Sequence, residues 1–304
     1  MSKIITVFGA TGNQGGSVIA SIQANPKLSS EYKIRGVTRD PSKPKGQELA
    51  QKGVELVTAD MSDKDSLKKA IEGSHTVFAV TNYWEYMSKD IEVTQGKNIA
   101  DICKATGVSL LIWSTIPHAG KVTNGKLANL PHFDAKADVS DYIREQKIPA
   151  AFLNAGCFMS NFPGSLQKSD QENSLNLNLH PDTQIPLFDA AGDTGKFVAA
   201  ILLNPSELLN KDVYAATGWY TPTDIVNAIE KFSGKKTTFN ELSDETFRSF
   251  LPEAIGLEMM ETFMMVRDYA YFGPGGDKIL AESLKYVVEK PTTLEDFIAR
   301  SGPY

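Results

Sequence analysis

Three glycines follow the first apolar run of the chain at intervals of three residues. Gly9, Gly12 and Gly15 stand between a β-branched run at residues 4–8 and an amphipathic helical segment. In a strand–turn–helix unit the first glycine permits the turn, the second lets the backbone approach phosphates, and the third lets the helix pack closely on the strand. The N-terminus of the helix presents free backbone N–H groups to an anion. The turn therefore predicts a βαβ unit that binds a dinucleotide.

Short β-branched runs alternate with amphipathic segments through the first half of the chain. This alternation is typical of a parallel sheet with helices on both faces, and it predicts a Rossmann-type, doubly wound α/β fold. Between two of the runs, Ser62 and Gly73 are the expected N-cap and end of a helix at 63–72. The candidate strands are 4–8, 33–37, 54–58, 76–80, 110–113 and 150–153.

The alternation stops after residue 153. Residues 160–190 are rich in Ser, Asn, Asp and Pro, which indicates an excursion away from the sheet. A helical run at 197–203 and a β run at 213–216 indicate a return, and helical patterns follow at 223–233, 244–251 and 254–270. We expect a dinucleotide-binding domain over 1–155, with 195–218 returning to its sheet. A smaller, mostly helical C-terminal lobe for substrate or partner is expected over 156–194 and 219–304.

Composition and charge exclude several classes of protein. The net charge is −6 and no Lys/Arg-rich run is present, so we expect no direct nucleic-acid binding. No stretch approaches the roughly 20 apolar residues of a membrane span. Two isolated cysteines, Cys103 and Cys157, fit a reducing compartment, and the four histidines lack metal-ligand spacing. We expect a cytoplasmic protein without a metal site, and a nuclear location stays open.

The residues after the second strand bear on the choice between NAD and NADP. An acidic residue there binds the ribose 2′-hydroxyl, whereas a basic residue accepts the 2′-phosphate. Arg39 and Lys43 favour NADP(H), because both can pair with a phosphate dianion. Asp40 could instead serve an NAD ribose, so NAD remains an alternative. Asp60, after the third strand, is expected either to reach the adenine or to be an ordinary loop residue.

With these features the chain resembles the NmrA-like family of atypical short-chain dehydrogenases, in particular its NADPH-sensing HSCARG-type members. The resemblance spans nearly the whole chain and is carried by residues 7–16 (VFGATGNQGG), 37–41 (VTRDP), 80–85 (VTNYWE) and 132–136 (HFDAK). It implies a Rossmann domain, a smaller C-terminal lobe and a cofactor in the cleft between them.

The resemblance also assigns roles near the nicotinamide. It implies that Thr81, Asn82 and Tyr83 line that half of the site, that Lys136 contacts the nicotinamide ribose, and that residues 158–161 close over the same end. Residue pattern and resemblance together give the full set of expected cofactor-binding residues: Gly9, Thr11, Gly12, Asn13, Gln14, Gly15, Arg39, Lys43, Asp60, Met61, Thr81, Asn82, Tyr83, Lys136, Phe158, Met159, Ser160 and Asn161.

Whether hydride is transferred depends on a second pair of residues. In active short-chain dehydrogenases a tyrosine four positions before the lysine donates a proton to the substrate, and the lysine lowers its pKa. Here Lys136 is present, but the tyrosine position is His132. Histidine can act as an acid or base near neutral pH, or can simply hydrogen-bond in the cleft wall. Lys136 and His132 are therefore the candidate catalytic residues.

Two functions from different classes follow. The first is a regulator that reads the ratio of NADPH to NADP⁺ with little or no turnover and passes the signal to a protein partner. The second is an NADPH-dependent reductase of small carbonyl, enone or quinone substrates, similar to isoflavone reductases, which work without that tyrosine. The replacement at His132 favours the regulator, and the retained Lys136 keeps the reductase open. Substrate or partner is expected at the cleft between the lobes, and a homodimer stays open.

Overall fold

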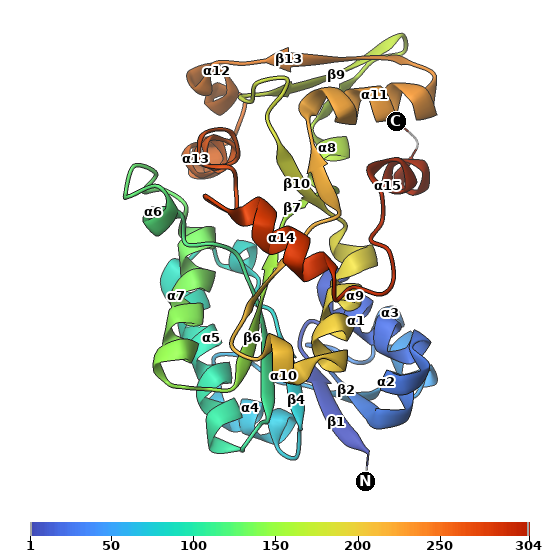
Figure 1. Ribbon diagram of the computed structural model, residues 1–304, viewed down its shortest axis with the longest axis vertical. Coiled ribbons are helices and arrows are strands. Elements are labelled where there is room, and N and C mark those ends of the chain that lie inside the picture. Colours follow the sequence, from blue (N-terminus) through green and yellow to red (C-terminus); the bar gives the residue numbers. More distant parts are fainter. Residues whose placement is uncertain (1, 303) are drawn as a thin grey trace.

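The computed structural model describes residues 2–302 and 304. Its centre is a seven-stranded sheet in the order β11-β6-β5-β4-β1-β2-β3, with every neighbouring pair parallel (Figure 1). This is the strand order of a doubly wound Rossmann sheet extended by one strand, so the predicted fold class is confirmed. The strands are β1 (Lys3–Val7), β2 (Tyr32–Val37), β3 (Glu55–Val57), β4 (Thr76–Ala79), β5 (Leu110–Thr115), β6 (Ala150–Ala155) and β11 (Asp212–Ala215).

Both faces of the sheet are buried by helices. Along β4, Val77 and Ala79 belong to one apolar core and Phe78 to the other, because successive side chains of a strand point to opposite faces. One core is shared with α1 (Asn13–Ala24), α2 (Pro26–Glu31) and α9 (Ala190–Leu203), and the other with α4 (Lys64–Ile71), α5 (Lys89–Ala105) and α7 (Pro131–Glu145). The shorter elements of this half are α3 (Pro44–Gln51), η1 (Tyr83–Glu85), α6 (Ala119–Val122) and α10 (Pro205–Leu208).

The start of α4 corrects one expectation. Its N-cap is Asp63, whose carboxylate accepts the backbone N–H of Asp65 at 2.9 Å. Ser62, the expected cap, instead donates its backbone N–H to the Asp60 carboxylate at 2.8 Å. Asp63 competes successfully because an aspartate is as good an N-cap as a serine.

The C-terminal lobe, above the Rossmann sheet in Figure 1, contains two small sheets that the sequence patterns did not predict. In β9 the buried positions alternate with more exposed ones, but Asn173 occupies a buried position, so the apolar pattern of a strand is hidden. The first sheet is β12 (Gly218–Tyr220), β10 (Ile185–Phe188) and β7 (Cys157–Phe158), and the second is β13 (Lys236–Glu241), β9 (Glu172–Leu177) and β8 (Leu166–Lys168). The helices are α8 (Asn161–Gly164), α11 (Pro222–Ser233), α12 (Asp244–Ser249), α13 (Glu253–Tyr269), α14 (Gly276–Leu284) and α15 (Leu294–Ser301).

Two contacts tie the later part of the chain to the Rossmann sheet. α9 packs tightly on α1: the backbone N–H of Gly195 donates to the Ser17 hydroxyl at 2.9 Å, and a Cβ at Gly195 would lie 2.1 Å from the Ser17 carbonyl oxygen. α14 covers the edge strand β11, where the backbone N–H of Tyr214 donates to the Ser283 hydroxyl at 3.0 Å. Both α9, which begins at Ala190, and α14 therefore pack against the Rossmann sheet and its helices.

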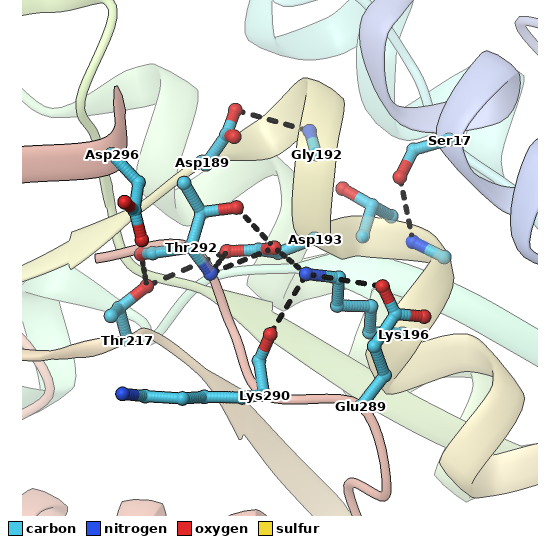
Figure 2. Close-up of polar contacts among 12 residues, drawn as sticks. Ser17, Asp189, Gly192, Asp193, Lys196, Thr217, Glu289, Lys290, Thr292 and Asp296 are labelled. Atoms are coloured by element: carbon cyan, nitrogen blue, oxygen red, sulfur yellow. Dashed lines mark hydrogen bonds and ion pairs between the residues drawn. The ribbon is translucent and has the colours of Figure 1, made fainter. Parts of the chain in front are cut away.

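A buried polar cluster fastens the segment between α14 and α15 to α9 (Figure 2). The Asp193 carboxylate is fully buried and lies 3.0 Å from the Lys196 amine. It also accepts the backbone N–H of Thr292 at 2.9 Å and the Thr292 hydroxyl at 2.8 Å. Lys196 donates further to the carbonyl oxygen of Lys290 at 2.9 Å. One buried carboxylate thus joins two segments about a hundred residues apart.

None of the described helices is both long and apolar enough to cross a membrane.

Candidate functional site

A cavity of about 1010 Å³ opens beyond the carboxyl ends of the parallel strands, beside the glycine turn. β1 and β4 are neighbours there, and the chain order reverses between them. Doubly wound sheets bind their ligands at this switch point. The second lobe completes the wall with Met259, Thr262 and Tyr271, so the cavity lies between the two lobes.

Most of the predicted site residues line this cavity: Gly9, Thr11, Gly12, Asn13, Gln14, Gly15, Arg39, Asp60, Met61, Thr81, Asn82, Tyr83, His132, Lys136, Phe158 and Asn161. Lys43, Met159 and Ser160 are not brought to it. Lys43 is exposed at the N-cap of α3, Met159 is buried in the core of the second lobe, and Ser160 is exposed on the surface. The basic residue beside the glycine turn is instead Lys45, whose amine lies 3.5 Å from the Thr11 carbonyl oxygen.

The glycine turn has the shape that a pyrophosphate requires. Gly9 adopts a φ of +63°, which favours glycine, and a Cβ at Gly15 would lie 2.3 Å from the Gly9 carbonyl oxygen. Gly12 is the N-cap of α1 and provides no side chain to occupy the first N–H groups of the helix. These donors and the positive end of the helix dipole therefore face the cavity. The residues present fit a dinucleotide phosphate.

The end of β2 presents one basic side chain to the cavity. Arg39 lines the cavity, and its Nη1 lies 2.5 Å from the Glu85 carboxylate of η1. Asp40 does not line it, because its carboxylate accepts the Ser42 hydroxyl at 2.6 Å and the Ser42 backbone N–H at 2.9 Å. These two hydrogen bonds hold the pKa of Asp40 below its ordinary value. The Asp40 carboxylate, which favoured NAD in the sequence, is therefore already hydrogen-bonded within the turn that contains it.

The amine of Lys136 is hydrogen-bonded by other residues of the site. Its amine donates to the Thr81 carbonyl oxygen at 3.0 Å, to the Thr81 hydroxyl at 2.9 Å and to the Glu92 carboxylate at 2.6 Å. An ammonium group has three N–H donors, so these acceptors use all of them. Glu92 is almost fully buried in α5, and its second oxygen has no hydrogen-bond partner among the described residues. Lys136 can reach a ligand only by giving up one of these bonds.

His132 faces the cavity one helical turn before Lys136 on α7, and a residue of the second lobe orients it. Its Nδ1 donates to the carboxylate of Glu258 on α13. The other Glu258 oxygen accepts the Tyr83 hydroxyl at 3.2 Å. Burial, and then the charge of Glu258, raises the pKa of Tyr83 to about 12, so this phenol stays neutral. With Nδ1 engaged, Nε2 is the ring nitrogen left for a ligand.

Sequence reasoning missed the carboxylates that organise this site. Glu92 orients Lys136, Glu258 orients His132, and Glu85 pairs with Arg39. A neighbouring pair fastens the same region, because both oxygens of Glu261 accept from the Asn129 amide groups at 2.7 Å. Glu258 and Glu261 are one turn apart on α13, a spacing that places both on the face toward α7. No local motif marks them, since their partners are distant in sequence.

The two cysteines are buried thiols. Cys157 lines the cavity, but burial raises its pKa to about 12. Burial raises the pKa of Cys103, on the buried face of α5, still further. Both are therefore protonated near neutral pH, a form that reacts poorly with oxidants. Within residues 2–302 and 304, no cluster of three or more His, Cys, Asp or Glu side chains could hold a metal ion.

The strand order, the glycine turn and the interlobe cavity define a dinucleotide-binding protein with a Rossmann fold. The NmrA-like family matches residues 1–298, and the chain belongs to this family. The resemblance to the NmrA-like family seen in the sequence motifs is thereby confirmed.

Individual family members and folds agree with this assignment. The NmrA-like family domain-containing oxidoreductase ptmS of Penicillium ochrochloron is 33% identical over 78% of this chain and 75% of its own. The crystal structure of NmrA, a negative transcriptional regulator, in complex with NADP has a TM-score of 0.81 at 19% identity, covering 99% of this chain and 95% of NmrA. The NADPH-dependent quinone oxidoreductase QOR2 of Escherichia coli, complexed with NADPH, has a TM-score of 0.77 at 21% identity, covering 97% and 99%.

Proposed function

We propose that this protein is an NADP(H)-binding, redox-sensing regulator. The observation that carries the proposal is the turn η1, which contacts both halves of the cavity wall. Glu85 at its end pairs with Arg39, and Tyr83 at its start hydrogen-bonds Glu258 of the second lobe. A ligand that alters the first contact can therefore alter the position of the second lobe.

The choice of NADP(H) has two supports. Arg39 lines the cavity and is the side chain we expect to bind a 2′-phosphate, while the competing carboxylate of Asp40 is bound to Ser42. QOR2, which shares the fold, is described in complex with NADPH, and NmrA is described in complex with NADP and also with NAD. A guanidinium is the side chain best suited to bind a phosphate dianion.

Signalling without turnover fits the state of the other polar groups. Lys136 has its three donors bound by Thr81 and Glu92, and the thiol of Cys157 is protonated. The redox state is then read through the bound cofactor, whose nicotinamide is cationic when oxidised and neutral when reduced. We propose a protein as the downstream partner, because the net charge of −6 opposes binding to nucleic acid.

One observation favours the reductase as a second candidate. NADPH supplies a hydride when bound, and a carbonyl or quinone that receives it needs one proton at its oxygen. Protonated His132 could donate that proton from Nε2, with the Glu258 carboxylate stabilising the imidazolium through Nδ1. The relative ptmS is called an oxidoreductase and QOR2 a quinone oxidoreductase.

A paired assay tests the proposal. We expect purified protein to bind NADPH but to leave its absorbance unchanged over buffer with panels of quinones, enones and aldehydes. Hydrogen–deuterium exchange of α13 should differ between the NADPH and NADP⁺ complexes, because Glu258 couples α13 to the cavity. Turnover that is lost in His132→Phe would overturn the regulator in favour of the reductase. Identical exchange in both complexes would also contradict redox sensing.

A further inference from the structure

The ion pair between Arg39 and Glu85 occupies the group that a 2′-phosphate would use. Both side chains line the cavity, and Nη1 lies 2.5 Å from Oε1. The Arg39 side chain is 81% exposed and that of Glu85 is 32% exposed. Exposed pairs contribute little net free energy, whereas a phosphate dianion can bind a guanidinium through two charge-assisted hydrogen bonds. A phosphate can therefore displace Glu85 from Arg39, but the loss of the ion pair reduces the net affinity for the phosphate.

We propose that Glu85 is a specificity-determining residue of the cofactor site, which competes with the 2′-phosphate for Arg39 and thereby tunes the preference for NADP(H) over NAD(H). Asp40 takes no part in this competition, because its carboxylate is bound to Ser42. NAD(H) has no 2′-phosphate and leaves the ion pair intact. The inference rests on the proposed NADP(H) site and adds to it the residue that opposes binding.

The displaced carboxylate also gives the site a route to the second lobe. Glu85 is the last residue of η1, and Tyr83 at the other end of this single turn is buried and bonded to Glu258. The Trp84 ring between them lies against both Tyr83 and His132, with ring centroids 5.1 Å apart in each case. A helical turn of three residues is too short for one end to move independently of the other. Loss of the Glu85 contact is therefore transmitted to Tyr83. NADP(H) causes this loss through its 2′-phosphate, whereas NAD(H) does not.

Calorimetric titration with NADPH and NADH isolates the 2′-phosphate, because the two differ only in that group. Adenosine 2′,5′-bisphosphate and ADP, one with and one without a 2′-phosphate, repeat the comparison without the nicotinamide. We expect Glu85→Gln to bind the bisphosphate and NADPH about two- to fivefold more tightly, with ADP and NADH unchanged. Arg39→Ala should weaken the bisphosphate and NADPH by about tenfold or more. In the Arg39→Ala background, Glu85→Gln should have no further effect, since the competing group is gone.

Glu48→Gln is the matched control. Glu48 is an exposed carboxylate paired with Lys52 on α3 at 2.6 Å, and it does not line the cavity, so its loss removes the same charge without freeing Arg39. Its affinities should equal those of the unmodified protein. An equal gain in Glu48→Gln and Glu85→Gln would show that net charge alone sets the affinity and would overturn the competition.

Other outcomes separate the inference from the proposed function. Bisphosphate binding that Glu85→Gln leaves unchanged would overturn the competition and leave the NADP(H) site standing. Equal gains for ADP and bisphosphate would show that Glu85 acts through the fold of the turn, which also overturns it. If neither the unmodified protein nor any variant bound the bisphosphate, both the competition and the NADP(H) site would be overturned. As a second readout, hydrogen exchange at residues 83–86 should rise with the bisphosphate and stay unchanged with ADP.

Discussion

At the scale of single residues, Lys136 joins a candidate ligand contact to the structure of the site. Its amine is the cationic partner of Glu92, which is almost fully buried in α5. We expect Lys136→Met to lower the free energy of unfolding by about 3–5 kcal/mol, because it leaves a buried carboxylate without its partner. Chemical denaturation measures this loss. The double variant Lys136→Met/Glu92→Leu should recover most of it, since both charges are then absent.

Lys121→Met is the control for removing a lysine. Lys121, on α6, pairs with Asp141 of α7, the helix that carries Lys136, but the Lys121 side chain is 63% exposed. Its loss should therefore cost no more than about 1 kcal/mol. A stable Lys136→Met variant with weakened NADPH binding would show that the amine contributes to the cofactor site and that Glu92 does not depend on it.

At the scale of elements, the start of α1 contains two adjacent glycines, Gly15 and Gly16, that differ in the space available for a side chain. A Cβ at Gly15 would lie 2.3 Å from a backbone carbonyl oxygen, whereas one at Gly16 would have its nearest neighbour at 3.5 Å, an ordinary contact. We expect Gly15→Ala to lose about 1–3 kcal/mol of stability and to bind NADPH poorly, because the turn must shift to admit the methyl group. Thermal unfolding and NADPH titration measure the two effects.

Gly16→Ala adds the same methyl group one residue later in the same helix. It should keep NADPH binding and be as stable or up to about 1 kcal/mol more stable, since alanine favours the helix over glycine. Equal damage in both variants would mean that the helix does not approach the turn as closely at Gly15 as the structure indicates.

At the scale of the whole molecule, Asp193 holds the end of the chain on the Rossmann domain. We expect Asp193→Ala to cost about 3–5 kcal/mol, because Lys196 and Thr292 lose the buried carboxylate that binds both. Limited proteolysis should then cut between α14 and α15 sooner than in the unmodified protein. Chemical denaturation measures the first effect and the rate of proteolytic cleavage measures the second.

Glu289→Ala removes the other carboxylate near Lys196. Glu289 is 70% exposed and lies 3.5 Å from the same amine, so its loss should cost no more than about 1 kcal/mol. Equal costs for Asp193→Ala and Glu289→Ala would contradict the view that the buried cluster fastens the C-terminal segment.

Local sequence patterns determined most of the Rossmann domain. The first six strands of its sheet were recognisable as short, mostly apolar runs, because strands covered on both faces carry apolar residues on both sides. The glycine turn was equally readable, since Gly9 and Gly15 meet steric requirements that only glycine satisfies. Arg39 was identified from its place after β2 and lines the cavity, whereas Lys43, the N-cap of α3, does not line it.

Tertiary structure alone decided how the polar groups of the site are held. His132 and Glu258 are 126 residues apart, Lys136 and Glu92 are 44 apart, and Arg39 and Glu85 are 46 apart. A carboxylate on a helix is an ordinary surface residue by pattern. Only the approach of α13 and α5 to α7 brings Glu258 to His132 and Glu92 to Lys136. Sequence therefore determined where a dinucleotide can lie, because that depends on backbone shape encoded locally. Which side chains are free to act on it was decided by pairings that form only when distant segments meet.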